Sequence, residues 1–337
     1  MPDRQILIVD DEPQNLAALR EVLENYYPLA FANGGEKGVE LARTLKPSLI
    51  LLDIEMPGLN GFEVCKLLKA DALTENIPVL FVTSKSDAVN EAAGFDCGAV
   101  DFIQKPIIPA VVLARVSTHL SLVRASKLEK SYHEAISMLG TAGHYNDNDT
   151  GVHIWRMAAY ARAISRAFGW SEIESQQLEA AAPMHDTGKI GIPAEILKKP
   201  GKLNPQEWQV MQTHTSIGYE ILSKSNAPVF QMAAKVALRH HEKWDGSGYP
   251  DGLAGLNIPE SARIVALADV FDALTMQRPY KKEWSVEAAR AEIRKNTGIH
   301  FEPRMVDCFD SIFSELIEIK ARWQEEQPRY KMAMAMA

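Results

Sequence analysis

The stretch Leu49-Ile-Leu-Leu-Asp53-Ile-Glu-Met-Pro-Gly58 decides the fold of the first part of the chain. Four apolar residues lead directly into a carboxylate, and a proline and a glycine follow, which is typical of a buried strand that ends in a polar loop. Similar short apolar runs occupy residues 6–9, 29–32, 79–82 and 100–103, and amphipathic stretches separate them. This alternation predicts a doubly wound α/β domain with a five-stranded parallel sheet.

Acidic side chains follow two of these predicted strands. Asp10 and Asp11 come directly after the first strand, and Asp53 ends the third. The carboxyl ends of parallel strands meet at one edge of a sheet, so we expect the three carboxylates to lie close together. Carboxylate oxygens suit a hard divalent ion such as Mg²⁺, which would shield negative charge during phosphoryl transfer to an aspartate. Thr83 and Lys105 lie at the ends of the fourth and fifth strands, within reach of phosphoryl oxygens.

Residues 3–122 resemble the receiver domains of response regulators. The motifs are Leu7-Ile-Val-Asp10-Asp11, Leu52-Asp53-Ile-Glu-Met-Pro-Gly58, Val82-Thr83-Ser84 and Gln104-Lys105-Pro106. The resemblance implies that Asp53 accepts a phosphoryl group from a sensor histidine kinase, with Mg²⁺ held by Asp10, Asp11 and Asp53. It also implies that Thr83 is the switch residue and that Lys105 contacts the phosphate. Five positions in matching order outweigh the alternative that these acids only cap helices in solvated loops.

Residues 109–140 are expected to form a helix that connects two domains. Apolar residues recur near helical spacing between many charges, and this pattern predicts a homodimer through the segment 123–140. Beyond residue 140 almost the whole chain is predicted as helix, which indicates an all-α second domain. The predicted helices span residues 152–168, 171–185, 205–222, 229–241, 259–275 and 285–295.

The second chemical pattern consists of histidines and acids without cysteine: Asp149, His153, His185, Asp186, His214, His240, His241 and Asp269. Imidazole with carboxylate suits iron, manganese, nickel, cobalt or zinc, whereas the lack of thiolate argues against a closed structural zinc site. A single histidine is more often an ordinary core or surface residue, but these candidates share one run of helices and several are adjacent. Asp269 lies in an apolar helix, residues 264–274, where a buried carboxylate needs a partner or a metal. The set therefore predicts an open catalytic metal centre.

Residues 140–315 resemble the HD-GYP phosphodiesterase family. The motifs are Met184-His185-Asp186-Thr-Gly-Lys189-Ile-Gly-Ile-Pro193, His240-His241-Glu242-Lys-Trp-Asp245-Gly-Ser-Gly248-Tyr249-Pro250 and Ala268-Asp269-Val-Phe-Asp272-Ala-Leu-Thr-Met-Gln-Arg278-Pro-Tyr280. The resemblance implies two divalent transition-metal ions, Fe or Mn before Ni, Co or Zn, with Asp186 bridging them. The metal ligands that it implies are His153, His185, Asp186, His214, His240, His241 and Asp269.

Substrate-contacting residues follow from the same resemblance. Lys189 would lie beside the scissile phosphate as a catalytic residue, and Arg278 and Lys281 would hold phosphate oxygens of the nucleotide. Tyr249 either faces the substrate or belongs only to a rigid Gly248-Tyr249-Pro250 turn, and both interpretations stay open.

The position four residues before His153 departs from part of the family. Members described with a third metal carry Glu there, whereas this chain has Asp149, whose side chain is one methylene shorter. Residues four apart share a face of a helix, so Asp149 and His153 would point the same way. We therefore expect two metals, with Asp149 as a candidate ligand of a third.

The implied activity is hydrolysis of cyclic di-GMP to pGpG, and on to GMP, regulated by phosphorylation of Asp53. Two alternatives stay open. In the first, the second domain is a catalytically weak module that binds a cyclic dinucleotide or a protein partner. In the second, the domain is an enzyme that acts on another cyclic dinucleotide, a linear dinucleotide or a phosphomonoester. Guanine recognition follows from no motif in the sequence, so the substrate rests on the family resemblance.

The composition limits the class of protein and its partners. The chain has 337 residues, of which 46% are hydrophobic and 24% charged, and a formal net charge of -8, which disfavours a general DNA-binding role. No apolar run reaches the roughly 20 residues that span a bilayer, so we expect a cytoplasmic protein without membrane insertion. The separated Cys65, Cys97 and Cys308 predict ordinary thiols.

The expected organisation has four parts. Residues 1–122 form the receiver domain, 123–140 the helical linker, 141–325 the HD-GYP domain and 326–337 a disordered tail. The low complexity of the last residues excludes the tail from the fold.

Overall fold

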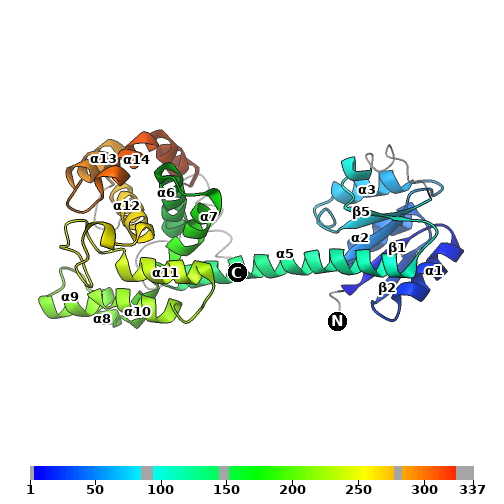
Figure 1. Cartoon of the computed structure of the whole chain (residues 1–337), viewed down its shortest axis with the longest axis horizontal. Helices are drawn as coiled ribbons and strands as arrows, with labels where there is room; N and C mark the ends of the chain where they lie inside the picture. Colours follow the sequence, from blue (N-terminus) through cyan, green and yellow to red (C-terminus); the bar gives the residue numbers. More distant parts are fainter. Residues whose placement is uncertain (1–3, 85–93, 144–151, 277–282, 324–337) are drawn as a thin grey trace. The chain divides into compact units, whose positions relative to one another are not determined.

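The computed structural model describes residues 4–84, 94–143, 152–276 and 283–323. The chain divides into two compact units, Met1–Ser131 and Tyr132–Ala337. Figure 1 shows the first unit as a sheet flanked by helices and the second as a group of helices. Within the described ranges, no helix is both long and apolar enough to cross a membrane.

The sheet of the first unit has five parallel strands in the order β2-β1-β3-β4-β5. The strands are β1 (Ile6–Val9), β2 (Leu29–Ala32), β3 (Leu49–Asp53), β4 (Val79–Thr83) and β5 (Asp101–Gln104). β1, β3 and β4 are buried along their whole length, because helices cover both faces of the sheet and the strands consist almost entirely of apolar residues. The predicted doubly wound α/β fold is confirmed, and Asp53 and Thr83 end neighbouring strands.

Two separate apolar cores join helices to the two faces of the sheet. α1 (Pro13–Leu23) and the first turns of α5 (Pro109–Gly143) pack against one face. α2 (Gly35–Leu45) and α3 (Gly61–Lys69) pack against the other. The chain therefore alternates strand and helix so that each face receives helices, which places the loops after β1, β3 and β4 at one shared edge.

The last turns of α5 belong to the second unit. Ile136 is buried in an apolar core that also contains Met184, the residue before His185. Gly140 lets the helix approach this segment closely, since a Cβ on Gly140 would lie 2.9 Å from the Cβ of Pro183. One continuous helix therefore begins on the sheet of the first unit and ends against the segment that directly precedes His185.

The second unit consists mainly of helices, which confirms the all-α prediction. Its helical segments are α6 (Val152–Phe168), α7 (Glu172–Ala181), η2 (Ala182–Met184), η3 (Thr187–Gly191), α8 (Ala194–Leu197), α9 (Pro205–Gln212), α10 (His214–Leu222), α11 (Pro228–Arg239), η4 (Gly255–Asn257), α12 (Glu260–Thr275), α13 (Val286–Lys295) and α14 (Pro303–Ser311). The main core lies between α6 and α12, where the rings of Tyr160 and Phe271 meet edge to face with centroids 5.1 Å apart. This packing fixes the two helices that carry His153 and Asp269.

Two predicted helices are interrupted in the structure. The helix predicted over 171–185 ends at Ala181 and continues as the 3-10 turn η2, where Pro183 has no backbone N–H to donate. The helix predicted over 205–222 divides at Thr213 into α9 and α10. The hydroxyl of Thr213 donates to the carbonyl of Val210, and side chains that bond local carbonyls in this way compete with helical hydrogen bonds.

Candidate metal centre and phosphoacceptor site

The carboxyl edge of the sheet brings Asp10, Asp11 and Asp53 together, with one oxygen of each within 4.8 Å of the others. Lys105 Nζ lies 2.8 Å from Asp53 Oδ1 and 3.1 Å from Asp10 Oδ2. Burial raises the pKa of Asp53 above its ordinary value, although the hydrogen bond from Lys105 acts in the opposite direction. Thr83 is buried at the end of β4, and its carbonyl accepts the backbone N–H of Lys105. The edge thus offers carboxylate oxygens to a hard cation and an ammonium group beside Asp53.

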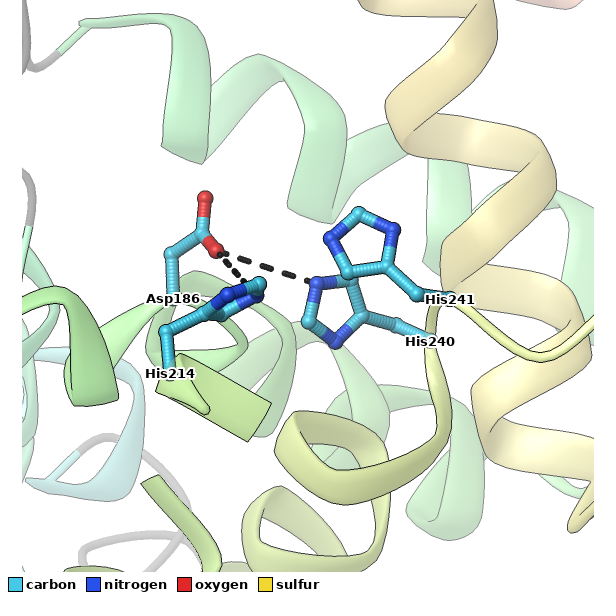
Figure 2. Close-up of side chains that lie close together, drawn as sticks. All are labelled: Asp186, His214, His240 and His241. Carbon is cyan, nitrogen blue, oxygen red and sulfur yellow. Dashed lines mark ion pairs between the residues drawn. The ribbon is translucent and has the colours of Figure 1, made fainter. Parts of the chain in front are cut away.

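A second cluster lies in the helical unit, where Asp186, His214, His240 and His241 converge (Figure 2). Asp186 lies between η2 and η3, His214 begins α10, and the two adjacent histidines follow the last residue of α11. One ligand atom of each lies within 4.8 Å of the others. Three imidazoles and a carboxylate with no thiolate fit a divalent transition metal.

Backbone carbonyls set the orientation of the imidazole rings. The Nδ1 atom of His214 lies 2.7 Å from the carbonyl of Met211, and Nδ1 of His240 lies 3.1 Å from that of Val236. Because a carbonyl only accepts, each Nδ1 donates and each Nε2 carries the lone pair. Among the described residues, these two buried Nε2 atoms have no hydrogen-bond partner, so both are disposed to bind a metal ion.

The carboxylate of Asp186 faces two groups of side chains. Its Oδ1 lies 3.4 Å from His214 Nε2 and 3.7 Å from His240 Nε2. Its Oδ2 lies 3.2 Å from His185 Nε2 and 2.8 Å from Lys189 Nζ. The carboxylate of Asp186 therefore directs one oxygen toward each group.

The histidines of the two groups differ in proton affinity. Burial, together with neighbouring histidines, lowers the pKa of His241 to about 3 and that of His240 well below its ordinary value. Burial alone would also lower the pKa of His185, but the charges of Asp186 and Asp269 raise it to about 9. The neutral ring is the form that binds a metal, so His240 and His241 are prepared for this role, whereas His185 must lose a proton.

His153 lies outside the four-residue cluster and faces a carboxylate that the sequence reasoning did not select. Its Nδ1 is 3.6 Å from Asp272 Oδ2, and Asp272 also accepts from Nε and Nη2 of Arg156 at 2.6 and 3.0 Å. All three residues are buried. The argument that singled out Asp269, a carboxylate in an apolar helix, applies equally to Asp272 and would have found it.

The loop after α11 contacts the cluster of Asp186, His214, His240 and His241, called here the metal cluster, through Tyr249. The ring of Tyr249 stacks on that of His241 with centroids 4.7 Å apart, and its backbone N–H donates to the carbonyl of His241. Tyr249 therefore lies directly beside a candidate ligand. Three further residues that the sequence predicts for the site, Asp149, Arg278 and Lys281, lie outside the described residues.

The comparisons with known proteins agree with this fold. The sequence pattern of the response regulator receiver domain matches residues 6–117, and that of the HD domain matches residues 120–305. Fold and site together define a receiver domain followed by a helical domain with a buried histidine and aspartate centre. The chain belongs to the response regulators that join a receiver domain to an HD domain.

Several curated relatives span nearly the whole chain. It is 40% identical to the cyclic di-GMP phosphodiesterase response regulator RpfG of Xanthomonas campestris pv. campestris, across 90% of this chain and 86% of that protein. It is 35% identical to a cyclic di-GMP phosphodiesterase of Thermotoga maritima, across 95% of this chain and 94% of the relative. The 3'3'-cGAMP-specific phosphodiesterase 2 of Vibrio cholerae is 44% identical across 58% of this chain and 37% of that protein.

Proposed function

We propose that this response regulator hydrolyses cyclic di-GMP to pGpG, and on to GMP, in its helical unit. The observation that carries the proposal is the buried carboxylate of Asp186, which faces histidines through one oxygen and His185 with Lys189 through the other. Two relatives that match along most of the chain are named as cyclic di-GMP phosphodiesterases, which supports this substrate.

We propose a centre of two divalent transition-metal ions, Fe or Mn. His214, His240 and His241, which lie together with Asp186, would bind one ion. By the family resemblance, His153, His185 and Asp269 would bind the other, and Asp186 would be shared. Such ions, when bound, supply Lewis acidity and an activated water for phosphodiester cleavage. Lys189 Nζ lies 2.8 Å from Asp186 Oδ2. Its ammonium group would stabilise negative charge on the phosphate oxygens.

Regulation is proposed to start at Asp53, with Mg²⁺ held by Asp10, Asp11 and Asp53 and a sensor histidine kinase as phosphoryl donor. Thr83 and Lys105 would contact the added phosphoryl group. α5 gives a physical route, because it packs on the sheet at its start and beside Pro183 near its end. The segment 123–140 of the same helix is the proposed homodimer seam.

The test begins with protein purified without oxygen and loaded separately with iron and manganese. Cyclic di-GMP and 3'3'-cGAMP are then incubated with the wild type and with a His185→Ala/Asp186→Ala control, and the products are separated by chromatography. We expect metal-dependent formation of pGpG that the control lacks. Faster cleavage of 3'3'-cGAMP would reassign the substrate, and intact substrates with retained binding would favour a binding module.

A further inference from the structure

The exposed side chain of Trp208 lies next to Tyr249, the tyrosine that stacks on His241. Trp208, in the first turn of α9, keeps 46% of its surface exposed. Its ring meets Tyr249 edge to face, with centroids 5.9 Å apart. Tyr249 in turn stacks on His241, so two ring contacts connect the exposed indole to a candidate metal ligand.

The loop that carries Tyr249 is held in place by the buried carboxylate of Glu242. Glu242 directly follows the two histidines, and its oxygens accept the backbone N–H groups of Asp251 and Leu253 at 3.0 Å each. Arg239 donates to the same carboxylate at 3.0 Å. Glu242 therefore ties the loop that carries Tyr249 to the end of α11, which fixes the ring over His241.

The tryptophan side is held by the start of α9. Asn204 and Glu207 form a reciprocal capping box, and Lys199 Nζ lies 2.6 Å from Glu207 Oε2. The backbone N–H of Trp208 donates to the carbonyl of Asn204 at 2.8 Å. A helix start fixed in this way positions the indole before any ligand arrives, so little ordering is needed on binding.

We infer that Trp208 provides the stacking surface for one nucleobase of the substrate, with Tyr249 supporting it from the side of the metal cluster. This inference rests on the proposed cyclic dinucleotide activity. Aromatic faces attract nucleobases in single-stranded and flexible nucleotides. Nearly half of the surface of Trp208 is exposed and available for such a contact. The phosphates would lie at the histidine cluster and Lys189, and a base would extend toward α9.

Steady-state kinetics test the role with three variants of the full-length, metal-loaded protein. We expect Trp208→Ala to raise the KM for cyclic di-GMP about tenfold to a hundredfold with little change in kcat, because stacking contributes to binding alone. Trp208→Phe keeps an aromatic face and should stay within about threefold of the wild type. Tyr219→Ala is the matched control, since Tyr219 is a 43% exposed aromatic residue on α10.

A binding measurement gives a readout independent of turnover. A non-hydrolysable phosphorothioate analogue of cyclic di-GMP should quench tryptophan emission in the wild type, and Trp208→Phe should lose this quenching while it still binds. Unchanged KM in Trp208→Ala, or equal quenching in Trp208→Phe, would overturn the stacking role although the hydrolase remains. If the wild type binds the analogue with this quenching but does not cleave cyclic di-GMP with either metal, the proposed activity fails and the stacking role stands.

Discussion

At the scale of single residues, the orientation of the histidine rings depends on the backbone. Carbonyl groups near helix ends accept from Nδ1 of His185, His214 and His240, so these rings need no second side chain to hold them. His153 differs, because it faces the carboxylate of Asp272. Candidate ligands held by helix ends keep their orientation without a metal, so the candidate centre is preformed to a large degree.

Lys189 is the residue whose removal should separate chemistry from metal binding. Lys189→Met removes the ammonium group beside Asp186, and we expect kcat for cyclic di-GMP to fall about a hundredfold to a thousandfold. Metal content, measured by mass spectrometry, should stay at the wild-type value. Lys295→Met, at the exposed end of α13, is the control. A variant that loses metal together with activity would make Lys189 a structural residue.

The buried pair of Arg156 and Asp272 should contribute strongly to stability. Asp272→Ala leaves the guanidinium group buried without its carboxylate, so we expect the free energy of unfolding to fall by about 3–5 kcal/mol. Urea unfolding followed by tryptophan emission measures this, because all six tryptophans lie beyond residue 131 and report on the helical unit. The double variant Arg156→Met/Asp272→Leu should regain part of the loss. A single variant as stable as the wild type would contradict the prediction.

At the scale of elements, local sequence pattern predicted what local forces determine. The five strands lie within one residue of their expected bounds, because a short apolar run between polar residues has one stable place in a parallel sheet. The interruption at Thr213 was missed, since it depends on competition between hydroxyl groups and helical hydrogen bonds. Spacing also could not reveal the contact between Trp208 and Tyr249, because it forms only when the loop after α11 folds back.

The contact between β5 and α5 should make the first unit sensitive to acid. Asp101 at the start of β5 pairs with Arg115 and with His119 Nε2, the latter at 3.0 Å. Burial alone would raise the pKa of Asp101, but these partners lower it below its ordinary value of 3.8. A depressed folded pKa gives stability that is present above pH 3.8 and is lost as the pH falls through the folded pKa.

Asp101→Asn tests this contact. At pH 7 we expect faster hydrogen exchange in peptides that cover β5 and the first turns of α5 than in the wild type. The difference should shrink below pH 3.8, where the wild-type carboxylate also becomes protonated. An equal difference at both pH values would mean that the charge of Asp101 contributes nothing.

At the scale of the whole molecule, α5 is shared by both units, which makes regulation testable. Beryllofluoride mimics the acyl phosphate, and we expect it to change kcat/KM for cyclic di-GMP in the wild type but not in Asp53→Asn. Gly140→Ala should reduce the response, because the added Cβ would press on Pro183 at 2.9 Å. If beryllofluoride changes neither hydrolysis nor oligomeric state in the wild type, the coupling through α5 is wrong.

Because α5 contributes residues to both units, it also determines where the helical unit can be separated from the receiver unit and fused to another domain. A fragment that began at residue 141 would lack Ile136, which is buried in the same apolar core as Met184. Its loss would expose apolar surface next to the candidate metal centre. Chimeras with other sensory modules should therefore be joined upstream, in the stretch 124–131, where the side chains are exposed. The hydrolase unit that can be transferred to another protein thus includes the last turns of α5.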